Sequence, residues 1–219
     1  LTMKPLDSRA LSKLQKQFQD ACAYQQRGAL DRAQHGYRRV LELDRWHVPS
    51  LNNLSLIYLQ KQAWREAASL LQRSLDRQSE QPDTVCNLGV CHEKLGDVSA
   101  ALSCYTQALQ WRPAFAGAYY NRAALLRREG RVHDALADYR QALLIQPAYA
   151  EAHNNVGNVL TALGQIDEAI HSFNEALRWQ PRYAEAWNNR GVCYWRQRRY
   201  TEALRDFDQA LALSPNYTE

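Results

Sequence analysis

The sequence predicts an all-α fold, an α-α solenoid of six helix-turn-helix repeats. Two observations support this prediction. Residue types recur at a step of 34 residues, and glycine and proline, only 9 and 7 of the 219 residues, concentrate at turns and repeat boundaries. Recurrence at a fixed step indicates that one supersecondary unit has been stacked, so that neighbouring copies bury a core that one copy cannot form alone.

The 34-residue step is clearest from Ala116 to Tyr217. Proline keeps the step at Pro113, Pro147, Pro181 and Pro215. Alanine keeps it at Ala101, Ala135, Ala169 and Ala203, and an aromatic residue keeps it at Tyr105, Tyr139, Phe173 and Phe207. Small residues that alternate with large ones at fixed spacing are what closely packed helix pairs require.

Counting back from these positions gives six ungapped repeats, and we number the positions of each repeat from 1 to 34. They span residues 14–47, 48–81, 82–115, 116–149, 150–183 and 184–217. Each repeat is expected to hold a helix A, a turn near position 15 and a helix B. The turn residue is glycine in four repeats, which favours the left-handed conformation that ends many helices. Gln62 and Arg198 replace this glycine in the other two, so their turns should be less stable but still formed.

The two ends of the chain depart from the pattern. Residues 1–13 are predicted to extend the first helix, because Asp7 and Ser8 precede a helical run of apolar residues. Residues 14–217 hold the six repeats, and residues 218–219 are predicted to begin a seventh that is cut short. We therefore expect the chain to be a fragment of a longer protein.

Composition and motifs exclude several classes of function. The net charge of +4 comes without blocks of lysine or arginine, so nucleic acid is not an expected partner. No apolar run is long enough for a membrane span. Five cysteines, an odd number without a CxxC pair, favour a reducing, cytoplasmic location. No metal-ligand spacing, cofactor loop or catalytic motif is present, so we expect no metal, no cofactor and no enzyme activity in this chain itself.

The period and residue types resemble the tetratricopeptide repeat (TPR), a helix-turn-helix unit of 34 residues. The resemblance implies a right-handed superhelix in which the A helices line a concave groove. Position 6 of a repeat would then face the groove. Asparagine occupies this position in five repeats, at Asn53, Asn87, Asn121, Asn155 and Asn189.

This asparagine ladder is the main candidate binding site. Asparagine costs helix stability relative to alanine, so five in mid-helix positions need a reason. A side-chain amide offers one acceptor and two donors, which suits it to bind a peptide backbone through both C=O and N–H. The ladder is similar to that in the TPR arm of O-GlcNAc transferase, where it engages extended polypeptides. Two alternatives stay open: the amides could be inherited by duplication, or they could bond to neighbouring helices.

We therefore expect a protein-interaction module, or scaffold, that binds an extended polypeptide in the concave groove. Side-chain selectivity is expected from Tyr120, Arg127, Arg128 and Trp195, although Trp195 could instead pack against a following repeat. An alternative is the substrate-recruiting arm of a larger enzyme, such as a glycosyltransferase, whose catalytic domain lies outside this chain. A third possibility is self-association through an uncapped C-terminal end where Leu204, Leu211 and Trp195 lie open.

Overall fold

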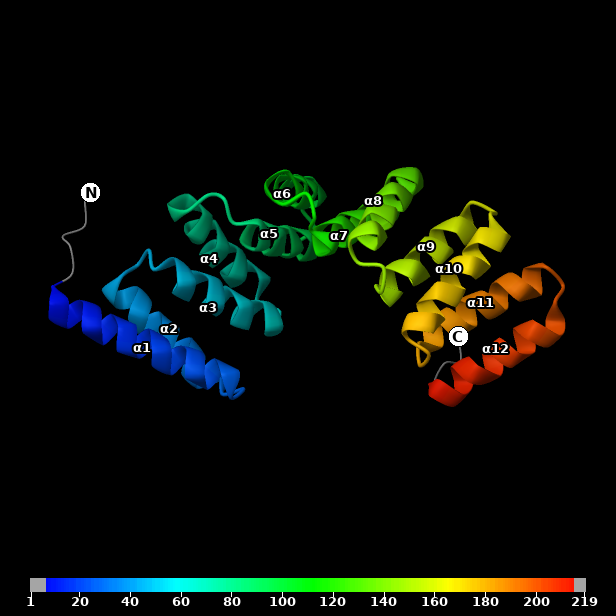
Figure 1. The fold of residues 1–219 in the computed structure, drawn as a ribbon. Helices are drawn as coiled ribbons and strands as arrows, with labels where there is room; N and C mark the ends of the chain where they lie inside the picture. Colours follow the sequence, from blue (N-terminus) through cyan, green and yellow to red (C-terminus); the bar gives the residue numbers. More distant parts are fainter. Residues whose placement is uncertain (1–6, 215–219) are drawn as a thin grey trace. The chain divides into compact units, whose positions relative to one another are not determined.

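The computed structural model describes residues 7–214, and this part of the chain contains twelve α-helices and no strand (Figure 1). The helices are α1 (Ser8–Gln26), α2 (Leu30–Leu43), α3 (Val48–Gln60), α4 (Trp64–Arg77), α5 (Pro82–Lys94), α6 (Val98–Trp111), α7 (Ala116–Arg128), α8 (Val132–Ile145), α9 (Ala150–Ala162), α10 (Ile166–Trp179), α11 (Ala184–Arg196) and α12 (Tyr200–Leu213). Odd-numbered helices are the predicted A helices and even-numbered helices the B helices. The all-α fold of helix hairpins is confirmed.

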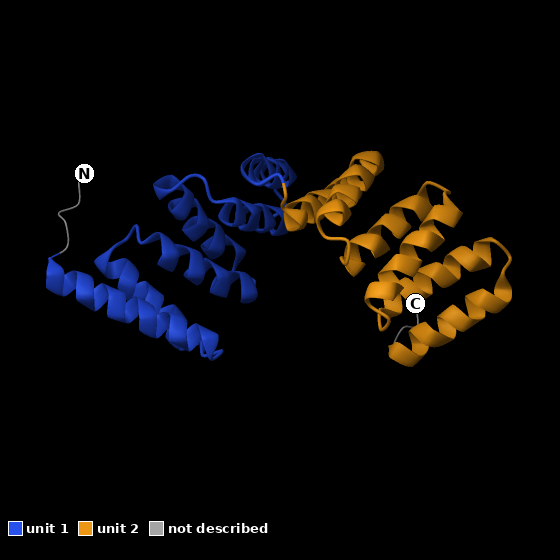
Figure 2. Cartoon of the chain, viewed as in Figure 1, with its two compact units in different colours: residues 1–113 blue, residues 114–219 orange. Residues whose placement is uncertain are grey.

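The chain divides into two compact units (Figure 2). Unit 1 spans residues 1–113 and holds α1 to α6, whereas unit 2 spans residues 114–219 and holds α7 to α12. Within each unit every helix packs against the next one along the chain, and in unit 2 α9 also contacts α11. The A helices of unit 2 are thus neighbours, and a surface built on them draws residues from repeats that are 34 positions apart.

The helix boundaries follow from local sequence. Asp7 caps α1, where its Oδ1 accepts the N–H of Ala10 at 2.7 Å, so the first helix begins at Ser8, ahead of the first repeat. Pro82 is the first residue of α5, a position at which a missing N–H donor costs nothing. The predicted start of a seventh repeat at residues 218–219 lies outside the described residues.

The turn between helices A and B has the left-handed conformation in all six repeats. Four of the turn residues are the predicted glycines, with φ between +74° and +85°. Gln62 and Arg198 adopt the same conformation with φ of 57° and 60°. The geometry of the turn is therefore kept even where a Cβ atom makes it costly.

Helices A and B of one repeat approach closely where position 8 of helix A meets position 24 of helix B. A Cβ atom built on Gly157 would lie 2.5 Å from Cε1 of Phe173, and one built on Gly191 would lie 2.7 Å from Cε1 of Phe207. Phe173 is fully buried by this contact. The glycine thus leaves the space that the aromatic ring fills.

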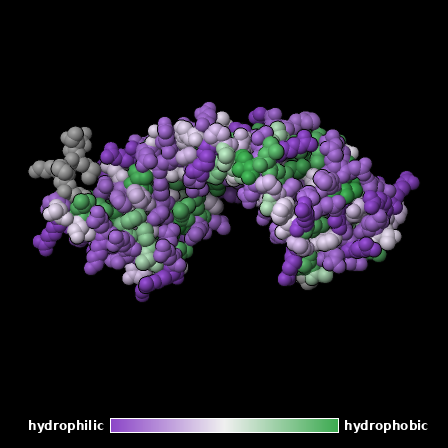
Figure 3. Space-filling view, viewed as in Figure 1, coloured by the Kyte–Doolittle hydropathy of each residue, from purple (hydrophilic) through white to green (hydrophobic). Residues whose placement is uncertain are grey.

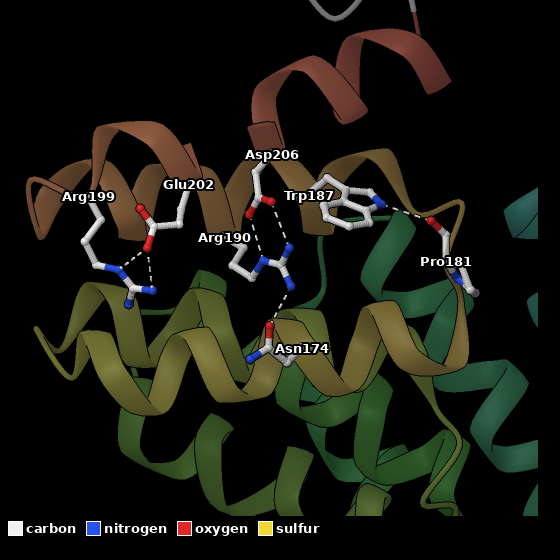
Figure 4. Close-up of polar contacts among 7 residues, drawn as sticks. All are labelled: Asn174, Pro181, Trp187, Arg190, Arg199, Glu202 and Asp206. Carbon is white, nitrogen blue, oxygen red and sulfur yellow. Dashed lines mark hydrogen bonds and ion pairs between the residues drawn. The ribbon is translucent and has the colours of Figure 1, made fainter. Parts of the chain in front are cut away.

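A second contact between helices A and B joins positions 7 and 23. In repeat 6 it is an ion pair: Nε and Nη2 of Arg190 donate to the two carboxylate oxygens of Asp206 at 2.7 and 2.8 Å (Figure 4). The Asp206 side chain is only 2% exposed. In repeat 2 the same two positions hold Leu54 and Leu70, both buried. The fold therefore accepts either an ion pair or two apolar side chains at this point.

Most of the face drawn in Figure 3 is covered by hydrophilic residues. Among residues 7–214, no helix combines the length and the apolar character needed to cross a membrane.

Replacing Arg198 by glycine should stabilise the chain by about 1 kcal/mol, because the left-handed conformation costs a residue with a Cβ atom roughly 1–2 kcal/mol and glycine's extra chain entropy offsets part of the gain. The exposed Arg198 side chain makes no hydrogen bond or ion pair within the described residues, so little else is lost. Chemical denaturation measures the change, and Gly164→Ala at the same turn position of repeat 5 should shift the midpoint the opposite way. An unchanged midpoint for Arg198→Gly would contradict the prediction.

The pair between Arg190 and Asp206 allows a second test. Asp206→Ala should destabilise the chain by about 3 kcal/mol, because it leaves the mostly buried guanidinium without its carboxylate. The double variant Arg190→Leu/Asp206→Leu should lie within about 1 kcal/mol of the wild type, as replacement of both charges is often neutral. Thermal and chemical unfolding of both variants measure this. A double variant as unstable as Asp206→Ala would show that the two helices cannot pack around leucines here.

Candidate interaction surface

The five predicted ladder residues lie on A helices, one in each of five repeats. Asn53 and Asn87 lie on α3 and α5 of unit 1, and Asn121, Asn155 and Asn189 lie on α7, α9 and α11 of unit 2. All five side chains are half-buried. They are therefore neither core residues nor fully solvated ones, and their hydrogen bonds decide what they can bind.

The amide nitrogens of two ladder residues in unit 2 bind neighbouring A helices. Nδ2 of Asn155 donates to the hydroxyl of Tyr120 at 3.0 Å. Nδ2 of Asn189 donates to Oδ1 of Asn154 at 3.2 Å and to Oδ1 of Asn158 at 3.0 Å. These bonds join α7 to α9 and α9 to α11, so part of the ladder holds successive repeats together.

Asn53 of unit 1 bonds in a comparable way. Its Nδ2 donates to the hydroxyl of Tyr37 at 3.1 Å, and that hydroxyl donates in turn to Oε1 of Gln25 at 2.6 Å. Asn87 makes no side-chain hydrogen bond within the described residues. The alternative in which the amides bond to neighbouring helices is thus correct for the NH₂ groups of Asn53, Asn155 and Asn189.

The carbonyl oxygens of the same side chains, unlike the nitrogens, make no hydrogen bond within the described residues. Oδ1 of Asn53, Asn155 and Asn189 accepts no hydrogen bond from the described residues, and none of the three oxygens is fully buried. An unbonded amide oxygen that reaches the surface is an acceptor for a donor from outside. The geometry therefore leaves the acceptor half of these amides available. Both N–H groups of Asn53 and of Asn189 are occupied, whereas Asn155 uses one of its two.

Next to Asn155, unit 2 holds a cluster of tyrosines. The rings of Tyr120 and Tyr149 stack with centroids 4.8 Å apart, and the ring of Tyr139 meets Tyr120 edge-on at 5.7 Å. Burial raises the pKa of Tyr139 to about 12, although the positive charge of Arg127 opposes the rise. Burial likewise raises the pKa of Tyr149 to about 12. Tyr120 is therefore half-buried among other rings and offers only part of its surface to a ligand.

Two carboxylates lie beside this cluster. Asn154, which is 1% exposed, donates from Nδ2 to Oε1 of Glu185 at 3.1 Å and to the hydroxyl of Tyr183 at 3.3 Å. Glu151 lies at the corresponding position of α9, two residues after Tyr149. Burial is the main cause that raises the pKa of Tyr183, and the charges of Glu185 and Glu151 add to it. Both carboxylates are thus close to the Tyr183 hydroxyl.

The remaining predicted site residues are exposed. Arg127 and Arg128 lie in the last turn of α7. Trp195 on α11 is 59% exposed, and Leu204 and Leu211 of α12 are exposed as well. These three apolar side chains are thus each exposed within residues 7–214, whereas self-association through them stays a prediction.

The sequence pattern did not predict that five further residues belong to the same surface: Asn154, Tyr149, Tyr183, Glu151 and Glu185. A signal was available, because the triplet Tyr-Ala-Glu stands at residues 149–151 and again at residues 183–185. Each triplet places a tyrosine before an A helix and a glutamate in its first turn. The sequence did not indicate that Tyr120, on helix A of the same repeat as Tyr149, stacks on the Tyr149 ring.

Unit 1 also contains two hollows that the sequence did not predict. The larger has a volume of about 640 Å³ and includes Arg38, Tyr58 and Arg73 in its lining, and the other, of about 480 Å³, lies between α1 and α2. Neither is lined by a predicted site residue. The described residues hold no group of three metal-ligating side chains.

The buried hydroxyl of Tyr139 generates a prediction on pH. Its oxygen makes no hydrogen bond of ordinary geometry. Its folded pKa of about 12 exceeds the unfolded value of about 10. Between these two values the unfolded chain has lost the proton and the folded chain retains it, so stability should fall as pH rises.

Tyr139→Phe should make the loss of stability from pH 10 to pH 12 less steep, without destabilising the chain at neutral pH, where Phe173 already occupies the same position of repeat 5. Denaturation midpoints across this pH range measure the slope. Tyr200→Phe, which changes a 59% exposed ring, is the matched control. A slope unchanged by Tyr139→Phe would show that this hydroxyl does not control alkaline stability.

Comparison with solved structures shows the fold. PilF of Pseudomonas aeruginosa is 14% identical over 95% of both chains, with a TM-score of 0.82. MamA of Desulfovibrio magneticus RS-1 is 20% identical over 78% of this chain and 97% of its own, with a TM-score of 0.69. YrrB, described as a TPR protein with an unusual peptide-binding site, is 19% identical over 83% of this chain and 93% of its own, with a TM-score of 0.67.

Family models match most of the chain in separate segments. A model of the coatomer epsilon subunit matches residues 46–112. No curated protein sequence matches the chain. Two tetratricopeptide repeat models match residues 114–182 and 155–218. The chain therefore contains tetratricopeptide repeats, which these two models assign to residues 114–218.

Proposed function

We propose that this chain is a protein-interaction module that binds an extended polypeptide on the surface of its A helices. The observation that carries the proposal is the set of unbonded carbonyl oxygens on Asn53, Asn155 and Asn189. Each can accept a backbone N–H of a bound chain, which every residue except proline offers whatever its side chain. The similarity of the fold to YrrB, a TPR protein with a peptide-binding site, supports the same class of function.

The spacing of the asparagines in unit 2 suits an extended chain. Neighbouring packed helices lie about 10 Å apart, and an extended polypeptide advances about 3.3 Å per residue. Successive asparagines would therefore meet about every third residue of the ligand. The three in unit 2, Asn121, Asn155 and Asn189, would bind a segment of about seven residues, and Asn53 and Asn87 would act in the same way within unit 1.

The hydrogen bonds within the chain change the expected mode of binding. Both N–H groups of Asn53 and of Asn189 already donate to neighbouring side chains, so these amides would each accept one N–H without also donating to a peptide carbonyl. Asn155 donates one N–H to Tyr120, and its second could donate to a ligand. One such bond contributes about 1 kcal/mol net. Recognition of the backbone alone is therefore weak, and the affinity depends on side chains around the ladder.

Selectivity would come from groups that flank the ladder. Arg127 and Arg128 are exposed at the end of α7 and can meet acidic side chains of a ligand. Trp195 is exposed on α11, and a large aromatic ring at an interface is a frequent anchor. Tyr120 contributes the ring edge that its neighbours leave open.

The test uses peptides selected from a library of random dodecapeptides against the full chain, with affinities measured by fluorescence anisotropy. Asn155→Ala/Asn189→Ala should weaken binding of a selected peptide by about tenfold, because two acceptors of about 0.5–1.5 kcal/mol each are lost. Tyr120→Phe is the matched control. It removes the hydroxyl that Asn155 binds within the chain but leaves the carbonyl of Asn155 in place, so affinity should stay within about threefold of the wild type.

Two results would contradict the proposal. In the first, no peptide is retained above a control surface without the chain. In the second, peptides bind but the asparagine double variant, folded by circular dichroism, binds them as tightly as the wild type. The second result would mean that the chain binds peptides elsewhere and that the asparagines serve only to join repeats.

A further inference from the structure

The surface of unit 2 has a second feature, at the N-terminal ends of α9 and α11. Tyr149 precedes α9 and Tyr183 precedes α11, and each is followed two residues later by a glutamate in the first helical turn. The ring of Tyr120 from α7 stacks on Tyr149. Three consecutive repeats thus bring aromatic rings and carboxylates to one place, which we call the tyrosine–glutamate cluster: Tyr120, Tyr149, Glu151, Tyr183 and Glu185.

The carboxylates of the cluster have no positive partner in the chain. Neither Glu151 nor Glu185 forms an ion pair with a lysine or arginine within the described residues. Glu185 accepts a hydrogen bond from Nδ2 of the buried Asn154, which holds one of its oxygens in place. A carboxylate that is fixed by a neutral donor keeps its full negative charge for an external cation.

The positive groups that act on the cluster act through Tyr120 and the neighbouring Tyr139. Arg127 acts on Tyr120 and Tyr139, and Arg128 acts on Tyr139. Around Tyr149 and Tyr183 the charged groups that act on the hydroxyls are Glu151 and Glu185 alone. The cluster is therefore negative at the α9 and α11 end.

Tyr139 closes one side of the cluster. It is fully buried, and its ring meets that of Tyr120 at 5.7 Å. The positive charge of Arg127 acts on its hydroxyl. The side of the cluster next to α7 is therefore filled by a buried ring, and a ligand would reach the cluster from the side of the glutamates.

We infer that the tyrosine–glutamate cluster binds the positively charged side chain of a lysine or arginine in the bound polypeptide. The cation lies near the carboxylates of Glu151 and Glu185, and its aliphatic stem packs on the tyrosine rings. Both interactions are attractive for this ligand, because a ring face and a carboxylate each carry negative potential. The inference rests on the proposed function, and it adds that the polypeptide carries a basic residue where it crosses α9 and α11.

The test measures the cation alone, apart from any peptide. Nα-acetyl-lysine amide and Nα-acetyl-arginine amide are titrated into the full chain, and the ring signals of its tyrosines, labelled with ¹³C, are followed by NMR. Nα-acetylnorleucine amide, which has a similar stem without the charge, is the neutral control ligand. We expect saturable shifts with the two cations and none with the neutral amide.

Glu151→Gln/Glu185→Gln should weaken binding of the cations at least about fivefold, because both carboxylate charges are removed while the amide oxygen introduced by Glu185→Gln still accepts from Asn154. Glu129→Gln/Asp208→Asn is the matched control. It changes the net charge of unit 2 by the same amount at two exposed residues, one after α7 and one on α12, and should bind like the wild type.

Three results would overturn the inference. They are equal shifts with the neutral amide, equal weakening of binding in both double variants, and no shift with either cation. Its failure is distinct from that of the proposed function. Dodecapeptides that bind through the asparagines without a basic residue, with no response to the amides, would leave the proposed function and remove the inference. If the cations give saturable shifts but no peptide binds, the cluster binds the cation and the proposed function is contradicted.

Discussion

The structure depends on how closely helix A and helix B of one repeat can approach. Gly157 and Gly191 leave room for the rings of Phe173 and Phe207, whose atoms would lie within 3 Å of any added Cβ atom. This contact fixes the two helices against each other, so the other face of helix A is left to meet the next repeat. Everything that the A helices present in common, including the asparagines, follows from that arrangement.

The asparagines of unit 2 join successive repeats and, in the proposed function, also bind the ligand. Asn155 and Asn189 join successive A helices through their NH₂ groups while their carbonyl oxygens stay unbonded. A side chain held by one hydrogen bond loses little further freedom when a ligand binds its other end. The hydrogen bonds that join the repeats would therefore also hold the amides in position for the proposed ligand, and the two roles do not exclude each other.

The electrostatics of the surface vary from one repeat to the next. Arg127 and Arg128 place positive charge at the end of α7, whereas Glu151 and Glu185 place negative charge at the start of α9 and α11. A polypeptide along these helices would meet charges of opposite sign within a few residues. Such a pattern favours one direction and register of the ligand, which the uniform asparagines cannot specify.

The sequence by itself determined the helices, their turns and the repeated positions, because a 34-residue step and left-handed turn residues constrain the backbone locally. It placed Asn121, Asn155 and Asn189 on successive A helices for the same reason. Only the tertiary structure decided that Asn155 donates to Tyr120, and that Asn154 links Glu185, Tyr183 and Asn189. Three of these four bonds join residues from different repeats, and the formation of all four depends on side-chain distances of a few ångströms that no periodicity specifies.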